Sequence, residues 1–315
     1  MRRTACDIIG LPGAGLARLP DSVDSAAHHP YTGVLTFQSL TMTELAVRRL
    51  LIDLESPFPG RWNGGDAFRS ALFNALSMSF PAGEQFFMDS VRAGLQRLPE
   101  AGRESMAREV QGFVGQEATH RRIHALFNDN LTRLGYDNEI ERRALRRREA
   151  HKNNDLRNQV AATAATEHFT AIFSDWLLRH PEVLDGAQPR LRMLWQWHCA
   201  EESEHRSTAY DLYQAMGGTH EWRIRVFKYI TYTFLGDVLR QTIRNLRHDG
   251  SLWRWSTWRS AMHTLFARDG MIRGNYGLWR DYFSRDFHPA HQDASRSRDW
   301  LQANTAHYSV VGQAR

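Results

Sequence analysis

Two short motifs in this sequence of 315 residues combine a glutamate with a histidine three positions later. They are Glu117–His120 in the segment QEATH and Glu202–His205 in the segment EESEH. Residues i and i+3 share one face of a helix, so each pair can bind one metal ion together. With 35 acidic residues and 15 histidines in the chain, chance produces about as many such pairs. Their context must therefore carry the argument.

The context is a further glutamate upstream of each motif, inside an otherwise apolar segment. Glu84 lies in FPAGEQFFM, 33 residues before Glu117, and Glu167 lies in VAATAATEHFTAIF, 35 residues before Glu202. This repeated arrangement is typical of dinuclear carboxylate bundles, in which two helices supply one Glu each and two supply Glu-x-x-His. Buried carboxylates are costly unless they are paired, and four together repel one another. Two divalent cations would neutralise them.

A third histidine lies on the same helix face as the second motif. His198 precedes Glu202 by four positions and His205 by seven, so the three side chains follow one stripe. We predict His198 as a seventh ligand; the alternative is a core or surface histidine beside Trp195 and Trp197. Carboxylate and imidazole ligands suit iron or manganese, with zinc as a further option. The absence of clustered cysteines excludes a structural zinc finger.

Neighbouring acids and histidines are expected to lie outside the ligand set. Glu201 and Glu204 point off the stripe and are expected to face solvent or to support the ligands. His124 and His168 are expected to be satisfied polar groups at the rim of the bundle, with support of the ligands as the alternative. Cys199 is interpreted as a small core residue.

The walls of a substrate cavity are expected about one helical turn from the ligands. The candidates are Phe113, Val114, Thr163, Ala164, Thr170, Ala171 and Trp195. His288 and His291 in FHPAHQD have a spacing that metal ligands can also show. We interpret them as part of a loop or C-terminal cap.

The elements that must position these residues are helices. From Asp66 onward apolar residues recur every three or four positions, and the alternation typical of strands is absent. Pro81 is expected to kink the first helix or to split it just before Glu84. The expected helices cover residues 66–97, 102–134, 138–153, 155–180, 188–216, 220–247, 251–268 and 271–284.

Long helices joined by short loops indicate a bundle. The predicted fold class is all-α, a ferritin-like helical bundle with an irregular N-terminal arm and extra C-terminal helices. Residues 1–64 form the arm, which packs on the core and has one extended piece near residues 45–54. Residues 65–218 form the metal-binding bundle, and residues 219–315 add C-terminal helices that complete the same domain.

The composition is that of a folded globular protein, with 42% hydrophobic residues and a net charge of +5. No segment approaches the ~20 apolar residues of a membrane span, and no signal peptide is apparent. With two cysteines, a cytoplasmic location is expected. The arginines between Arg142 and Arg148 lack interleaved aromatic residues, so we interpret them as a solvated helix face and expect no nucleic-acid partner.

Several segments together resemble a bacterial family described as predicted metal-dependent hydrolases, over about residues 45–290. They are FNALSMSFPAGEQFFMDSVR, FVGQEATHRRIHALFN, ATEHFTAIF, WQWHCAEESEH and YFSRDFHPAHQD. The ligand pattern is similar to that of ferritin-like dinuclear proteins, and the added histidine is similar to the site of dinuclear-iron arylamine N-oxygenases. The ligands that the resemblance implies are Glu84, Glu117, His120, Glu167, His198, Glu202 and His205.

The leading interpretation is an O2-dependent dinuclear non-haem iron oxygenase or oxidase. It would bind two iron ions, use O2 and an electron donor, and oxidise a small organic substrate, for example at an amine nitrogen. The alternative is a dinuclear hydrolase, in which water activated by the metals attacks an ester, amide or phosphate. A non-catalytic metal-binding bundle is the second alternative. A homodimer is compatible with each of these interpretations.

Overall fold

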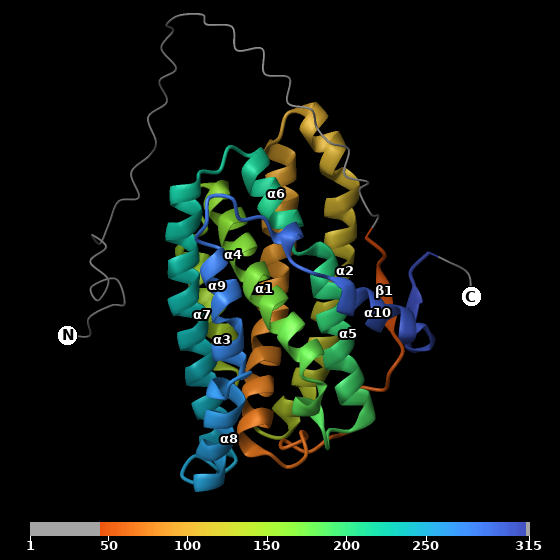
Figure 1. Cartoon of the computed structure of the whole chain (residues 1–315), viewed down its shortest axis with the longest axis vertical. Coiled ribbons are helices and arrows are strands. Elements are labelled where there is room, and N and C mark those ends of the chain that lie inside the picture. The colour runs from red at the N-terminus through yellow and green to blue at the C-terminus, as the bar shows by residue number, and fades with distance from the viewer. Residues whose placement is uncertain (1–44, 313–315) are drawn as a thin grey trace, which may run out of the picture. The chain divides into compact units, whose positions relative to one another are not determined.

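The computed structural model describes residues 45–312, and within this range the chain is mainly helical (Figure 1). The α-helices are α1 (Ala67–Arg97), α2 (Glu100–Arg133), α3 (Glu139–Ala150), α4 (Leu156–Arg179), α5 (Pro189–His205), α6 (Thr208–Ala215), α7 (His220–His248), α8 (Trp255–Phe266), α9 (Met271–Asp281) and α10 (Ser295–Ala303). Short 3-10 helices are η2 (Pro181–Leu184), η3 (Pro289–His291) and η4 (Thr305–His307). The prediction of an all-α bundle is confirmed.

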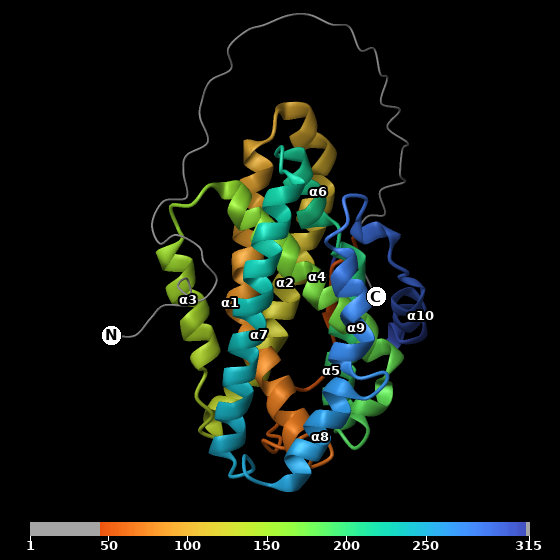
Figure 2. The same cartoon turned by 60° about the vertical axis from the view of Figure 1, so that its left-hand side comes forward.

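Four helices form the core of the bundle. α1 packs along α2 and α4 along α5, while α1 also contacts α4, and α2 contacts α5. The two hairpins are joined by a connection that contains α3, as in bundles with a single long crossover. α7 packs against α1 and α4, and α9 packs against α4 (Figure 2).

The core contains two apolar clusters, with a polar layer between them. On α1 the first cluster ends at Phe80 and the second begins at Phe87, so Glu84 lies between the two. On α2 the gap falls between Val114 of the second cluster and Ile123 of the first. On α5 and α6 the change of cluster falls between Ala200 and Ala209, on either side of His205, whereas Glu167 of α4 lies among residues of the second cluster.

Pro81 does not split α1, which is assigned as one helix through this position. A proline lacks the N–H that would bond the carbonyl four residues earlier, here the carbonyl of Ser77. That carbonyl instead accepts a hydrogen bond from Nδ2 of Asn128 on α2, at 2.9 Å. The neighbouring helix thus replaces the bond that the proline removes.

The helix predicted over residues 188–216 is interrupted, because α5 ends at His205 and α6 begins at Thr208. At the interruption the side chain of Arg206 donates hydrogen bonds to the carbonyls of Gln292 and Asp293. These partners lie almost 90 residues further along the chain. Local periodicity could not predict the break.

The chain segments on either side of the bundle were predicted less completely. The extended piece near residues 45–54 contains β1 (Arg48–Leu50), which pairs antiparallel with β2 (Tyr308–Val310). Residues of this part of the arm, including Phe58 and Trp62, are buried in the first apolar cluster. Residues 1–44 of the predicted arm lie outside the described residues.

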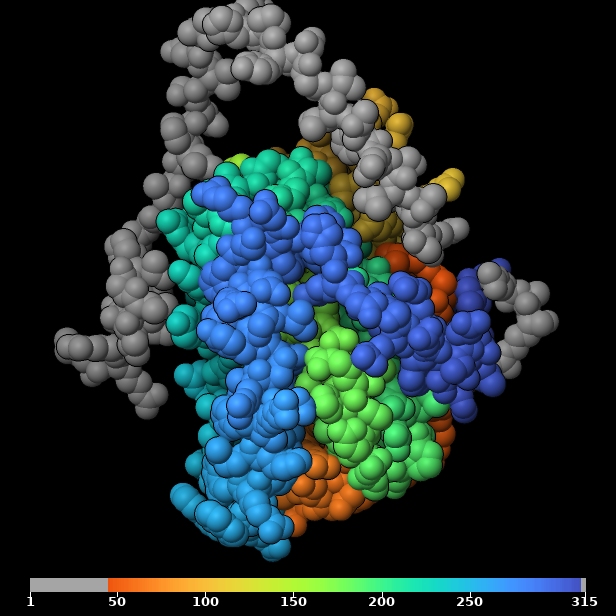
Figure 3. All heavy atoms as spheres, in the orientation of Figure 1, coloured from red at the N-terminus to blue at the C-terminus, as the bar shows by residue number. Residues whose placement is uncertain are grey.

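Of the C-terminal helices, α7, α8 and α9 fall within the predicted ranges to within a few residues, whereas α10 was not predicted. Its sequence, SRSRDWLQA, has few apolar residues, so it carries little helical periodicity. α8 and α9 form the outer layer over one face of the bundle (Figure 3). No helix in the described part of the chain is long and apolar enough to cross a membrane.

Candidate metal centre

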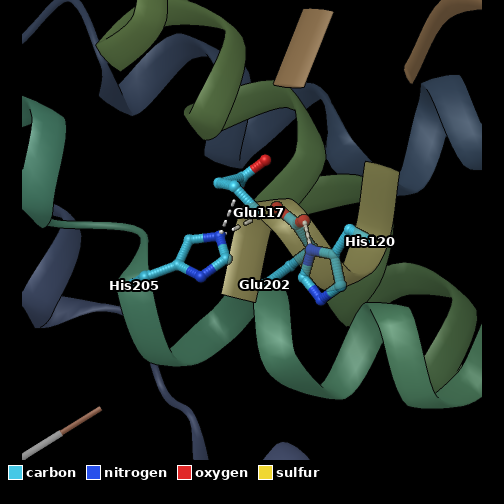
Figure 4. Close-up of side chains that lie close together, drawn as sticks. All are labelled: Glu117, His120, Glu202 and His205. Carbon is cyan, nitrogen blue, oxygen red and sulfur yellow. Dashed lines mark ion pairs between the residues drawn. The ribbon is translucent and has the colours of Figure 1, made fainter. Parts of the chain in front are cut away.

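The structure brings all seven predicted ligands into the polar layer between the two apolar clusters. α1 carries Glu84, α2 carries the first Glu-x-x-His motif, α4 carries Glu167, and the end of α5 carries the other three. None of the seven residues is more than 3% exposed. Figure 4 shows the side chains of the two motifs converging from α2 and α5. The full set is Glu84, Glu117, His120, Glu167, His198, Glu202 and His205.

The donor atoms form two overlapping groups. In the first, one donor atom from each residue of the two Glu-x-x-His motifs lies within 4.8 Å of the others. In the second, donors of Glu84, His120 and His198 lie within the same distance of one another. The fourth carboxylate, Glu167, adjoins the first group because its Oε2 lies 3.4 Å from Nε2 of His205. His120 belongs to both groups, so the geometry provides two adjacent positions for ions.

Glu202 lies between these two positions. Its Oε2 lies 3.5 Å from Nε2 of His205. Its Oε1 lies 2.8 Å from Nε2 of His198 and 3.3 Å from Nδ1 of His120. The two oxygens of this carboxylate therefore face different groups of predicted ligands, so Glu202 would help to hold both ions.

The polar atoms that face the layer fit divalent metal ions. Both oxygens of Glu84, Glu117 and Glu167 are buried without a hydrogen-bond partner. Nδ1 of His120 and Nε2 of His205 are likewise buried without a hydrogen-bond partner. Unsatisfied buried polar atoms are rare because each carries a desolvation cost. Four carboxylates carry four negative charges, which two divalent cations balance.

In each of the three histidines, the ring nitrogen that points away from the other predicted ligands contacts a neighbouring side chain. Nε2 of His120 lies 3.0 Å from Oε2 of Glu201, and Nδ1 of His205 lies 2.8 Å from Oε1 of Gln116. Nδ1 of His198 lies 2.6 Å from Nε2 of His124. Metal-binding histidines usually have such a partner, which fixes the tautomer and the ring orientation.

The tautomer of His198 follows from the hydrogen-bond chain behind it. Ser77 donates its hydroxyl proton to Oδ1 of Asn128, so Oγ of Ser77 must accept from Nδ1 of His124, 2.9 Å away. A neutral His124 then accepts at Nε2 from Nδ1 of His198. The remaining nitrogen of His198, Nε2, carries a free lone pair and faces Glu202. This is the form that a metal ligand requires.

An arginine and a glutamine complete the surroundings of Glu201 and Glu204. Arg48 donates to Glu201 at 3.0 Å and to Glu204 at 2.7 Å. Nε2 of Gln116 also donates to Glu204, at 2.7 Å. These two acids were expected either to face solvent or to support the predicted ligands. Glu201 is fully buried, which excludes the first expectation for this residue and agrees with the second. Sequence reasoning missed Gln116 and Arg48; the only signal was that Gln116 adjoins Glu117.

The expectation that His124 and His168 lie at the rim of the bundle was wrong, because both are buried. His124 lies within the core as part of the chain behind His198. His168 contacts the rings of Phe227 and Tyr282 and lies 3.1 Å from the carbonyl oxygen of Leu278. α7 and the end of α9 cover this side of α4, which residue spacing on α4 alone could not indicate.

Other predicted positions have structural surroundings of their own. Cys199 is buried, as predicted for a core residue. His288 lies just before η3 and contacts Asp211 at 2.7 Å, in agreement with a loop position shared with His291. The arginines of α3 form ion pairs with acids such as Glu139 and Asp237 and are partly exposed.

The predicted cavity walls are buried near the metal centre. The ring of Phe113 lies 5.0 Å from that of His205, and Trp195 lies 5.2 Å from His124. Thr163 and Thr170 are also buried. Their role as walls of a substrate cavity stays a prediction.

Burial and charge set the protonation of the ligands when no ion is bound. Burial, and then the charge of Glu117, raise the pKa of Glu84 well above its usual value and that of Glu167 to about 8. Burial opposes the charge of His120, yet its hydrogen bonds to glutamates raise its pKa to about 10. Burial and the nearby His120 lower the pKa of His198 to about 4. In the absence of metal ions, protons on Glu84, Glu167 and His120 therefore neutralise part of the negative charge of the site.

Comparison with known proteins identifies the family. The family model described as "predicted metal-dependent hydrolase" matches residues 46–293, a range that includes all seven candidate ligands. The chain belongs to this family. No curated protein and no solved structure matches the chain. Membership of a metal-dependent family together with the buried Glu and His cluster indicates divalent metal ions as cofactors.

The predicted O2-dependent iron oxygenase, and with it the assignment as an oxidoreductase, was wrong. The family is one of hydrolases, which matches the alternative interpretation. The error has a chemical reason: carboxylate and imidazole ligands serve hydrolytic and oxidative metal centres alike, so ligand spacing cannot separate them. O2 and an electron donor have no part in hydrolysis and are withdrawn as partners. The homodimer and the cytoplasmic location stay predictions.

Proposed function

We propose that this member of the predicted metal-dependent hydrolase family is a dinuclear hydrolase of a small-molecule substrate. It would use water to cleave an ester, amide or phosphate bond. The observation that carries the proposal is the convergence, in one buried layer, of carboxylate oxygens and imidazole nitrogens that have no hydrogen-bond partner.

The proposed ligands divide between two neighbouring ions. Glu117, Glu167 and His205 face one position, and Glu84 and His198 face the other. His120 and Glu202 lie between the positions. The set suits zinc, manganese or ferrous iron. A bound divalent ion acts as a Lewis acid that polarises the scissile group and lowers the pKa of the attacking water.

The protein's own residues supply orientation and a dry environment. Glu201, Gln116 and His124 hold the three histidine rings through their second nitrogens. The apolar clusters above and below the layer limit the access of water, which strengthens electrostatic interactions inside it. Arg48 places a positive charge at one carboxylate oxygen of Glu201, and the other oxygen contacts His120.

The test begins with the metal content of the full chain. Protein purified from cells grown with zinc, manganese or iron should contain about two ions per chain. Metal-free protein and protein reloaded with each metal are then assayed on chromogenic esters, anilides and phosphates. At least one class should be hydrolysed by the loaded protein only.

A pair of matched variants makes this test specific. Glu202→Ala should lose metal and activity together, whereas Glu149→Gln, an exposed residue of α3, should retain both. A loaded protein that hydrolyses none of the three classes would contradict the hydrolase. Hydrolysis that persists at full rate in Glu202→Ala would contradict the proposed site.

A further inference from the structure

The outer side of α8 carries large apolar side chains that are exposed to solvent in the described part of the chain. Trp255, Trp258, Met262 and Phe266 are spaced by three and four residues, so they form one stripe along the helix. Trp253 precedes the helix and is 90% exposed, and Trp255 is 80% exposed. We call these five residues the α8 face.

The fold makes little use of the α8 face: Nε1 of Trp258 donates to the carbonyl of Leu252 at 2.8 Å, but all five residues are at least 40% exposed. The buried residues of α8 are small or hydroxyl-bearing, Thr257, Ala261 and Thr264, and one larger residue, Leu265, packs partly buried against the first apolar cluster. Oγ1 of Thr257 donates to the carbonyl of Ser251 at 2.9 Å, which holds the start of the helix. In an ordinary surface helix the larger apolar residues face the core. In α8 most of them face outward, which indicates a binding surface.

The region around the α8 face is strongly basic. Residues 240–280 contain eight arginines and two aspartates. Arg240 and Arg244 pair with aspartates of the bundle, and Asp249 accepts from Arg61. The other six arginines are exposed and form no ion pair within the described residues. They are Arg247, Arg254, Arg259, Arg268, Arg273 and Arg280.

We propose that the α8 face binds the surface of a lipid bilayer that carries anionic headgroups. Tryptophan is enriched at the boundary between headgroups and acyl chains. A short helix with an apolar stripe and flanking arginines can lie in that boundary without crossing the membrane. α8 and the turn before it lie at one end of the bundle, where a flat surface can approach them (Figures 1 and 2).

Two other occupants fit the same surface less well. A second copy of the chain would bring the six unpaired arginines close to their own counterparts, which costs electrostatic energy. A nucleic acid would pair with the arginines and stack on the tryptophans. It would leave Met262, in the middle of the stripe, without an apolar contact, because bases stack on aromatic rings and not on an aliphatic side chain.

The experiment measures binding of the full metal-loaded protein to vesicles by flotation. Vesicles of phosphatidylcholine alone are compared with equimolar phosphatidylcholine and phosphatidylglycerol, at low and high salt. The protein should float with the anionic vesicles, less so at high salt, and remain unbound with phosphatidylcholine alone. R254Q/R259Q should weaken binding about 30-fold, because each arginine near an anionic surface contributes about fivefold. W253S/W255S should abolish it.

The matched control is R146Q/R148Q, which removes the same charge from exposed arginines of α3 that have acidic partners. It should bind as the unaltered chain does. Metal content and circular dichroism of each variant report whether the fold is intact. Quenching of tryptophan fluorescence by brominated lipids provides a second measurement that needs no variant.

The outcomes separate the occupants. An unaltered chain that neither floats with anionic vesicles nor is quenched would overturn the proposal, as would equal binding by W253S/W255S. A dimer in solution that W253S/W255S dissociates, without vesicle binding, would assign the α8 face to a second copy. Retention of an oligonucleotide that is lost in the same variant, again without vesicle binding, would assign it to a nucleic acid.

Discussion

Among the three histidines of the metal centre, His198 has the most distinctive partner. His120 and His205 are held by a carboxylate and an amide, whereas His198 is held by a second imidazole, that of His124. A neutral imidazole in turn depends on the group behind it for its tautomer, here Ser77. The orientation of this proposed ligand therefore rests on residues of two other helices.

At this scale we predict that His124→Ala weakens metal binding without removing the site. All seven ligands remain, but Nδ1 of His198 loses its partner and the ring is free to turn. Loss of such partners typically costs 10–100-fold in metal affinity. Competition with a chromogenic chelator should show weaker binding of one of two ions. The control is His263→Ala, an exposed residue of α8. Equal affinities in both variants would show that His124 has only a packing role.

Single elements are shaped by contacts that compensate for unfavourable residues. Pro81 would leave the carbonyl of Ser77 without a partner inside α1, and Asn128 of α2 supplies the missing donor. The same two side chains bond to each other through Oγ of Ser77 and Oδ1 of Asn128. A helix that would otherwise be weakened beside Glu84 is thereby kept in place.

We predict that Asn128→Ala lowers the free energy of unfolding by about 1–3 kcal/mol, the cost of a buried acceptor without a partner. Pro81→Ala restores an N–H to α1 and with it a bond to the carbonyl of Ser77. Asn128→Ala should therefore cost less in the Pro81→Ala background. Urea unfolding of the four proteins measures this coupling directly. Additive effects would mean that the proline and the asparagine act independently.

α2 also accommodates the segment before β1 through two glycines. A Cβ at Gly112 would lie 2.5 Å from Cβ of Leu45, and one at Gly115 would lie 2.3 Å from Cγ2 of Val47. Such distances are too short for carbon atoms that are not bonded. The glycines let this segment lie directly on α2, and Arg48 of β1, which follows it, contacts Glu201.

Gly115→Ala should therefore destabilise the protein, although alanine is the better helix former. In an open position of a helix the same change stabilises by about 1 kcal/mol. Here the added methyl group must push Val47 away from α2. This movement would weaken the ion pair between Arg48 and Glu201. Urea titration of both proteins measures the change in the free energy of unfolding, and its sign shows whether the added methyl group destabilises the protein. A more stable variant would show that the segment does not need this close approach.

At the scale of the whole molecule, the polar layer lies between the two apolar clusters. The core helices cross this layer, and each contributes at least one buried ionisable group to it. Without metal ions, protons must neutralise part of this layer, because burial and the charge of Glu117 raise the pKa of Glu84 and Glu167. Metal binding and the stability of the entire fold are consequently linked.

We predict that removing the metal with a chelator lowers the melting temperature of the full chain. Ions that bind only the folded state stabilise it, by an amount that grows with their free concentration. Adding back zinc or manganese should restore the original value. Differential scanning calorimetry of the loaded, stripped and reloaded protein provides the measurement. Identical melting curves before and after chelation would be inconsistent with buried ions in the polar layer.

The sequence by itself determined the helical class and which seven Glu and His residues meet in the buried polar layer; their role as ligands stays a prediction. Both depend on local spacing, because the helical repeat fixes which side chains share a face. Glu202 and His205 lie on one side of a helix wherever that helix packs. An ionisable residue within an apolar segment, such as Glu84 or Glu167, must also enter the core with its helix. These features needed no knowledge of distant contacts.

Only the tertiary structure decided which groups stand behind the ligands and where the helices are interrupted. Arg48 meets Glu201 from 153 residues away in the chain, and Arg206 reaches Asp293 across 87 residues. The spacing of residues along one helix gives no information about such distant partners. The burial of His124 and His168 likewise depends on other helices that cover them. Contacts between segments far apart arise from packing, which local periodicity constrains but does not specify.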